Sequence, residues 1–194
     1  MAIAAGFGLW LGLKNEQPRE PQWQSMLAYG TPRGLTDFSL ATADGGVIDR
    51  TSLQGRYSVL FFGFLNCPDV CPTTMVTLSQ VDKLLADVPE MDRPNLLFVS
   101  VDPARDSTEA IAAYVQHFSP HILGATAAID VLEPFAKQMG VLFLTQPEPS
   151  GGYSVDHSAH FVVLDPQVRI IGIMRPPHEA QAIAADLREL AGSR

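Results

Sequence analysis

Two cysteines four positions apart constrain this chain more than any other feature. Cys67 and Cys71 are the only cysteines among 194 residues, and a proline follows each of them. Proline disfavours the α conformation in the residue before it, so both cysteines should lie in a loop and not in a helical turn. Pro72 suits the first position of a helix, where its missing N–H costs nothing. Cys71 is therefore expected to be the N-cap of a helix.

The segments on either side of the cysteines fit a junction between a strand and a helix. Residues 57–64 form a nearly unbroken apolar run, which is typical of a strand buried on both faces of a sheet. Residues 73–88 carry apolar side chains at helical spacing. Free N–H groups and the helix dipole favour anions at such a junction, so thiolates should be stabilised there.

Further along the chain, apolar segments alternate with helical patterns. Strands are expected at residues 96–101, 121–126 and 140–144, helices at 106–118, 131–139 and 178–190, and hairpins at 38–48 and 161–173. Asp106 and Glu109 fit a capping box for the second of the long helices. This order predicts an α/β fold with a central mixed sheet flanked by helices and an N-terminal hairpin. The cysteine pair at the end of the first long core strand favours a thioredoxin-like topology.

Composition narrows the classes of function. Hydrophobic residues make up 46% of the chain, enough for the core of one domain, which we expect at residues 35–194. A formal charge of −8 and the lack of a basic cluster argue against a nucleic-acid partner. Two cysteines are too few for a disulfide scaffold.

The N-terminus predicts an attachment to a membrane. Residues 1–13 carry no charged side chain, and residues 14–34 form a polar, proline-containing segment that is expected to be a linker. Thirteen helical residues span about 20 Å, less than the ~30 Å hydrocarbon core, so the segment fits a partial anchor, a short signal or a buried helix. The abrupt change to polar residues favours the anchor, which would place the domain on the extracytoplasmic side, in the periplasm or on the outer face of the cytoplasmic membrane.

The two thiols allow a disulfide, a metal site, or two inert buried cysteines. A pair of thiolates holds Cu(I), and an added imidazole makes the site suitable for both Cu(I) and Cu(II). Of five histidines, His117 and His121 lie near a helix end and His178 is expected to face solvent. His157 and His160 are the remaining candidates. Spacing alone does not separate them, and a histidine at this place is also a common turn residue.

Three motifs together resemble the Sco/SenC family. They are residues 62–72 (Phe-Gly-Phe-Leu-Asn-Cys-Pro-Asp-Val-Cys-Pro), 99–106 (Val-Ser-Val-Asp-Pro-Ala-Arg-Asp) and 155–158 (Val-Asp-His-Ser). The resemblance covers about residues 30–190. It implies a thioredoxin-like fold, an N-terminal membrane anchor, and copper bound by Cys67, Cys71 and His157. Two departures are visible: Leu65-Asn66 stands where many relatives have Thr-His, and His160 is an additional histidine that could compete as a ligand.

The same resemblance implies a biological role. Members of the family assist assembly of the binuclear copper centre of cytochrome c oxidase, as metallochaperones or as reductants of the target cysteines. The implied partners are the copper-accepting subunit of the oxidase and other copper chaperones.

Other functions remain open from the residues themselves. In a thiol–disulfide oxidoreductase, Cys67 would attack a target disulfide and Cys71 would resolve the mixed disulfide. Thioredoxin-like reductases place a cis-proline opposite the cysteines, whereas residues 151–160 contain no proline, which favours the metal site. A peroxidase is disfavoured because the residues before Cys67 lack the Pro-x-x-x-Thr/Ser pattern. A copper sensor is a further alternative.

Overall fold

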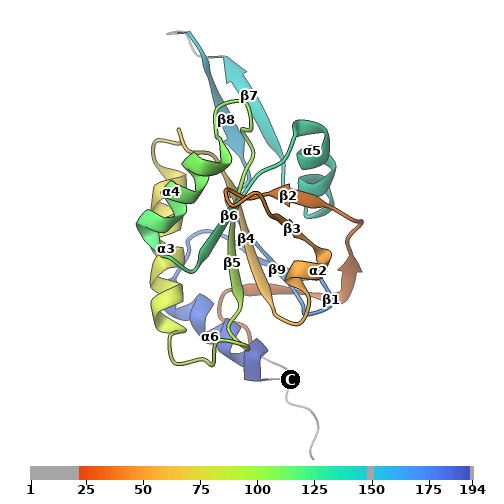
Figure 1. Cartoon of the computed structure of the whole chain (residues 1–194). Helices are drawn as coiled ribbons and strands as arrows, with labels where there is room; N and C mark the ends of the chain where they lie inside the picture. The colour runs from red at the N-terminus through yellow and green to blue at the C-terminus, as the bar shows by residue number, and fades with distance from the viewer. Residues whose placement is uncertain (1–21, 148–150, 193–194) are drawn as a thin grey trace, which may run out of the picture.

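The computed structural model describes residues 22–147 and 151–192, which fold around a six-stranded sheet (Figure 1). Its strands lie in the order β1-β10-β9-β4-β5-β6. In that order they span Met26–Gly34, Arg169–Met174, Phe161–Leu164, Ser58–Gly63, Asn95–Ser100 and Ile122–Ala125. The β4, β5 and β6 strands are parallel, whereas β9, β10 and β1 pair antiparallel. The predicted mixed sheet is confirmed.

Two small sheets and five helices complete the described part of the chain. The predicted N-terminal hairpin consists of β2 (Ser39–Ala41) and β3 (Val47–Asp49), and a second hairpin consists of β7 (Phe143–Pro147) and β8 (Tyr153–His157). The helices are α2 (Arg50–Leu53), α3 (Val70–Leu84), α4 (Thr108–Phe118), α5 (Ile129–Gln138) and α6 (Ala180–Gly192). In Figure 1, α3, α4 and α6 lie on one side of the sheet and α5 on the other. The fold is thioredoxin-like α/β.

The central strand β4 contributes to the cores on both faces of the sheet. All six of its residues are buried, as expected for a strand with neighbours on each side. Successive side chains point to opposite faces. The Phe62 ring therefore packs against Phe135 of α5, whereas the Phe61 ring packs against Phe98 and Phe161 on the face covered by α3.

Four expectations about local structure are wrong. Residues 26–34, within the expected linker 14–34, form the edge strand β1. Asp69, and not Cys71, is the N-cap of α3. Ser107, and not Asp106, caps α4 through a bond to the Ala110 N–H. The strand expected at 140–144 is instead β7, Phe143–Pro147, which pairs with β8 as a hairpin.

The expected anchor at residues 1–13 lies outside the described residues. Within the described part of the chain, no helix combines the length and the apolar character needed to cross a membrane.

Candidate metal centre

The junction between β4 and α3 brings the two thiols together. The Cys67 N–H donates to the Phe64 carbonyl at 3.3 Å, which folds the loop into a turn directly after the strand. The Cys71 N–H, in the first turn of α3, donates to Cys67 Sγ at 3.3 Å. The first N–H groups of a helix have no partner within the helix, and Cys67 Sγ supplies one for the Cys71 N–H. Both cysteines are free thiols.

Gly63 makes room for the second thiol. A Cβ at this position would lie 2.9 Å from Cys71 Sγ and 2.8 Å from the Phe98 ring. Both distances are shorter than side chains normally allow. The lack of a side chain at the end of β4 is thus what lets the Cys71 side chain, which has no exposed surface, lie against the sheet.

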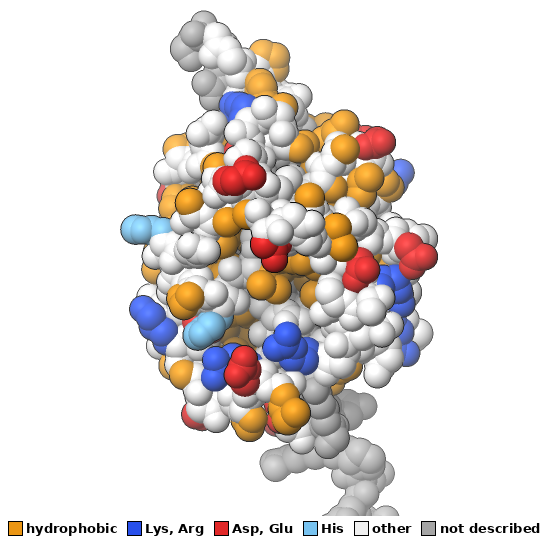
Figure 2. Space-filling model, viewed as in Figure 1, with side chains coloured by type: hydrophobic (Ala, Val, Ile, Leu, Met, Phe, Trp, Pro, Cys, Tyr) orange, Lys and Arg blue, Asp and Glu red, His pale blue; other side chains and the backbone are white. Residues whose placement is uncertain are grey.

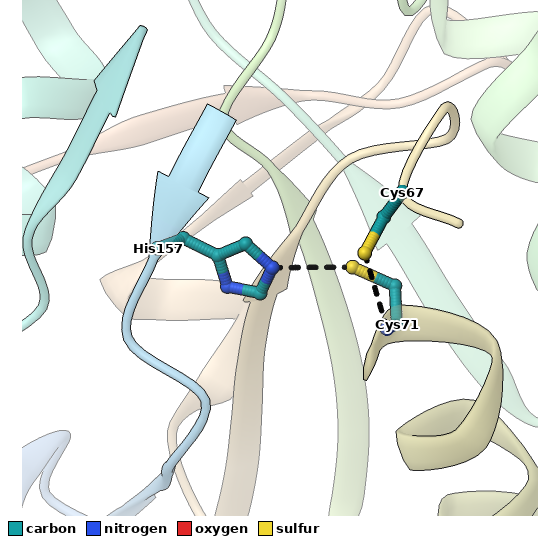
Figure 3. A group of neighbouring side chains, drawn as sticks. All are labelled: Cys67, Cys71 and His157. Carbon is teal, nitrogen blue, oxygen red and sulfur yellow. Dashed lines mark hydrogen bonds between the residues drawn. The ribbon is translucent and has the colours of Figure 1, made fainter. Parts of the chain in front are cut away.

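The imidazole comes from the end of β8, 86 residues after Cys71. His157 Nδ1 lies 3.1 Å from the Ser158 carbonyl, which can only accept, so Nδ1 carries the proton. The other nitrogen, Nε2, is then unprotonated and lies 3.3 Å from Cys71 Sγ. Phe61 and Phe64 contact the ring edge-on, at centroid distances of 5.9 and 5.8 Å. Figure 3 shows the ring directed at the two sulfur atoms.

The two sulfurs and the imidazole nitrogen form one donor group. One ligand atom from each of Cys67, Cys71 and His157 lies within 4.8 Å of the others. Among the residues that the structure describes, this is the only group of three or more His, Cys, Asp or Glu side chains that could hold a metal ion. Three donors at about 2.0 to 2.3 Å from a shared ion would lie about 3.5 to 4 Å apart in a trigonal arrangement. The observed spacing therefore suits a single metal ion after small side-chain movements.

Burial keeps the Cys71 thiol and the His157 imidazole uncharged in the metal-free protein. It is the main cause that raises the pKa of the Cys71 thiol, and the hydrogen bond with Cys67 adds to it. The expectation that the helix N-terminus stabilises a thiolate is wrong for Cys71, because desolvation outweighs the dipole. Burial also lowers the pKa of His157, so its ring is neutral near pH 7. A metal that binds here must displace the Cys71 proton.

The remaining histidines lie outside this donor group. His160, expected as a competing ligand, is held by a hydrogen bond with the Met139 backbone. His178 was expected to face solvent, but its ring packs on Phe161 at 4.3 Å and its Nε2 lies 2.7 Å from the Ala159 carbonyl. His121 pairs with Asp82.

Sequence reasoning missed the side chains that hold the hairpin. Tyr153 and Asp102 bond to each other, and Arg105 bonds to both residues. Asp102 directly follows the strand expected at 96–101. The signal that could have indicated a larger role is its place in the 99–106 motif, where a second acid and a cation follow within four residues. Asp156, the neighbour of His157 in the Val-Asp-His-Ser motif, is exposed, and the Ser158 carbonyl is the partner of Nδ1.

The surface near the site is apolar on the hairpin. Leu142 and Leu144 are 69% and 64% exposed and line a shallow hollow together with Asp156 and His157. Figure 2 shows acidic and basic side chains interspersed on the face in view, without an extended basic patch.

Comparison with known proteins gives consistent matches. The family model described as SCO1/SenC matches residues 28–192. Protein SCO2 homolog, mitochondrial, from Bos taurus is 35% identical over 167 residues, which cover 84% of this chain and 63% of that protein. Protein SCO2, mitochondrial, from Saccharomyces cerevisiae is 33% identical over 170 residues, and the match spans 84% of this chain and 53% of that protein.

A solved structure agrees with the fold. It is described as the crystal structure of yeast Sco1 with copper bound, and it is 30% identical to this chain with a TM-score of 0.74. The match covers 84% of this chain and 91% of that one.

Proposed function

This chain belongs to the SCO1/SenC family, and we propose that it is a copper-binding metallochaperone that assists assembly of the binuclear copper centre of cytochrome c oxidase. The observation that carries the proposal is the meeting of two thiols and one unprotonated imidazole nitrogen within 4.8 Å. The copper-bound yeast relative supports it, because that protein has the same fold and is 30% identical in sequence to this chain.

The donor chemistry fits copper. Soft sulfur ligands favour Cu(I), and an imidazole nitrogen also accommodates Cu(II). Cys67, Cys71 and His157 would hold the ion. The Ser158 carbonyl fixes the tautomer that leaves Nε2 free to bind, as outer partners of metal-binding histidines generally do. Copper is here a cargo that the chain receives and passes on.

The partial exposure of the site suits transfer of that cargo. Cys71 is buried, whereas Cys67 is partly exposed. An incoming thiolate of an acceptor can therefore reach the ion from the Cys67 side while the buried sulfur still holds it. The proposed partners are the copper-accepting subunit of cytochrome c oxidase and other copper chaperones.

Anaerobic titration of the reduced protein with Cu(I), followed by spectra of the Cu(II) form, tests this function. We expect one copper per chain, sulfur-to-copper charge-transfer absorption, and nitrogen hyperfine structure in the EPR spectrum. Cys71→Ala should abolish stoichiometric binding. Undiminished stoichiometry and affinity in both Cys71→Ala and His157→Ala would refute the proposal.

A thiol–disulfide oxidoreductase that keeps the copper-ligand cysteines of a target reduced is the second candidate. The two free thiols lie within 4.8 Å of a common partner, and the more exposed Cys67 precedes the buried Cys71. Cys67 would attack a target disulfide, and Cys71 would displace the target thiol, which leaves a disulfide in this chain and two thiols in the target. Failure of the reduced chain to reduce a protein disulfide, measured as the absence of new target thiols, would contradict this role.

We also propose an extracytoplasmic location with a membrane tether through residues 1–13, a linker that ends before β1, and a single folded domain from β1 onward. The absence of charge in residues 1–13 supports the tether. The bovine and yeast relatives are mitochondrial by their names. Membrane fractionation of the full chain and of a variant without residues 1–13 tests the tether. Equal recovery of both proteins in the supernatant would contradict it.

A further inference from the structure

The histidine-bearing hairpin lies outside the sheet that carries the thiols. The β7 and β8 strands pair only with each other among the described strands, and in Figure 1 the hairpin extends beyond the end of the six-stranded sheet. Backbone hydrogen bonds of the main sheet therefore do not set the position of His157. Side-chain contacts must hold the hairpin over the cysteines.

The loop after β5 makes those contacts at the start of β8. Arg105 Nε donates to Asp102 Oδ2 at 2.5 Å, and Arg105 Nη1 donates to the Tyr153 carbonyl at 2.7 Å. The Tyr153 hydroxyl donates to Asp102 Oδ1 at 2.7 Å. The guanidinium also lies over the Tyr153 ring, 3.8 Å from its centroid. The side chains of Arg105 and Asp102 thus close a ring of charge-assisted bonds with the hydroxyl and the backbone carbonyl of Tyr153, and Asp102 is only 3% exposed.

The same loop also holds the segment that leads to the cysteines. Asp106 Oδ2 accepts the Leu65 N–H at 2.9 Å and the Ser100 hydroxyl at 2.6 Å. Leu65 is two residues before Cys67. One short segment, residues 102–106, is therefore bonded to both parts of the chain that supply donor atoms.

We propose that the 102–106 loop, acting through Arg105 and the bond between Asp102 and Tyr153, is the positioning element that keeps the His157 imidazole against the two sulfurs. This rests on the proposed copper function. None of the three side chains belongs to the donor group, so their effect on copper is transmitted through the hairpin. Without them the thiols keep their place on the β4–α3 junction, whereas the imidazole keeps only its ring contacts with Phe61 and Phe64 and is held less firmly against the sulfurs.

The test compares Tyr153→Phe and Arg105→Ala with the unaltered full chain. Tyr153→Phe removes only the hydroxyl, and Arg105→Ala removes the guanidinium fork. In Cu(II)-loaded protein, both variants should keep the sulfur charge-transfer bands, whereas the nitrogen hyperfine structure should weaken toward that of His157→Ala. Transfer of Cu(I) to a chelator should become about 10- to 100-fold faster, the range by which outer partners typically affect metal sites.

A measurement without copper follows the hairpin itself. In the metal-free protein, amides of residues 153–158 should exchange with deuterium about tenfold faster in Arg105→Ala, because opening of the hairpin becomes easier. If the unaltered chain shows no sulfur-to-copper bands, the copper function fails and the exchange experiment still tests the positioning role. If copper binds normally but neither variant changes the hyperfine structure or the exchange, the positioning role is overturned.

Arg169→Ala is the matched control. Arg169 pairs with buried Asp165 at 2.6 Å, an ion pair between residues four apart. Asp165 follows β9 at Leu164, which pairs with Ser58 at the first residue of β4, so this pair is at the opposite end of the strand from the cysteines. Its loss should lower thermal stability as Arg105→Ala does and leave the copper spectra and the hairpin exchange unchanged. If Arg169→Ala also changes both the copper spectra and the deuterium exchange of the hairpin, general destabilisation explains the results and the positioning role is overturned.

Discussion

His157 Nε2 lies 3.3 Å from Cys71 Sγ, although 86 residues separate the two in the chain. In the metal-free protein, Nε2 is an acceptor and the protonated thiol is a donor, so the pair forms a hydrogen bond. A metal ion would replace the proton between them. This contact therefore shows that the hairpin is folded against the β4–α3 junction. It also shows that two of the three donor atoms are already close together before copper binds.

Removal of the imidazole should weaken copper binding strongly. We expect His157→Ala to lower Cu(II) affinity by more than about 100-fold, above the usual effect of losing only an outer partner. Competition with a chromophoric chelator measures it. His121→Ala is the control, because His121 is 59% exposed and pairs with Asp82 away from the donor group. Equal losses in the two variants would contradict a specific role for His157.

A methyl group at the end of β4 should disturb the second thiol. The added Cβ in Gly63→Ala would lie 2.9 Å from Cys71 Sγ, so we expect a loss of about 1–3 kcal/mol in the free energy of unfolding and weaker copper binding. Denaturant titration and copper titration measure the two effects. Gly30→Ala is the matched control, since nothing lies within 4 Å of a Cβ there. A Gly63→Ala protein that matches Gly30→Ala in both measurements would argue against the crowding.

Acid should destabilise the metal-free protein through buried imidazoles. Burial lowers the pKa of both His160 and His178 in the folded state. The unfolded chain then binds protons more readily, so the free energy of unfolding falls as the pH drops below about 6.5, the ordinary histidine pKa. The double variant H160Q/H178Q should show a shallower fall between about pH 7 and pH 5.5. Urea unfolding at several pH values measures the slopes, and identical slopes would refute the expectation.

The buried carboxylate of Asp186 should be needed to hold β1. It accepts the N–H groups of Gln24, Ser25 and Met26, each at 2.8 Å. Asp186→Ala should therefore lower the free energy of unfolding by about 3 kcal/mol, because several N–H groups lose their partner. Glu189→Ala, an exposed acid on the same helix, is the control. Chemical denaturation measures the difference, and an Asp186→Ala loss no larger than that of the control would count against this bond network.

Copper should stabilise the folded chain. A ligand that binds only the folded state adds about 4 kcal/mol to the free energy of unfolding when its free concentration is about 1,000 times Kd. Thermal unfolding with buffered Cu(I), before and after chelation, measures this. The increase should disappear in Cys71→Ala, and a stabilisation that survives this substitution would indicate binding elsewhere.

The fold near the thiols could be predicted because its signals are local. The apolar run of β4 and the helical spacing of α3 are continuous in sequence, and the cysteines lie between them. The strands at the edges of the fold have weaker sequence patterns. The β1 strand exposes most of its residues and contains two glycines and a proline, so its composition resembles that of a linker. The β7 strand ends at Pro147 and exposes four of its five residues.

The third donor could not be chosen from spacing. His157 and His160 are three residues apart, and only the end of β8 and the bond to the Ser158 carbonyl direct one ring toward the sulfurs. The role of Asp106 could not be predicted from the local sequence either. It stands where a capping residue is expected, but its carboxylate is engaged by Leu65 and Ser100 from other parts of the chain. Contacts across the sheet outweighed the local preference.

The donors lie on two separate parts of the fold: the sulfurs at the β4–α3 junction and the imidazole on the β7–β8 hairpin. The ligand set can therefore be altered on one part without changing the other. The sulfur end depends on the same buried strand that organises the core, so changes there also affect folding. The nitrogen end is carried by strands whose outer residues are exposed. A thioether or a second nitrogen ligand introduced on β8 would thus alter metal preference while the folding core stays intact.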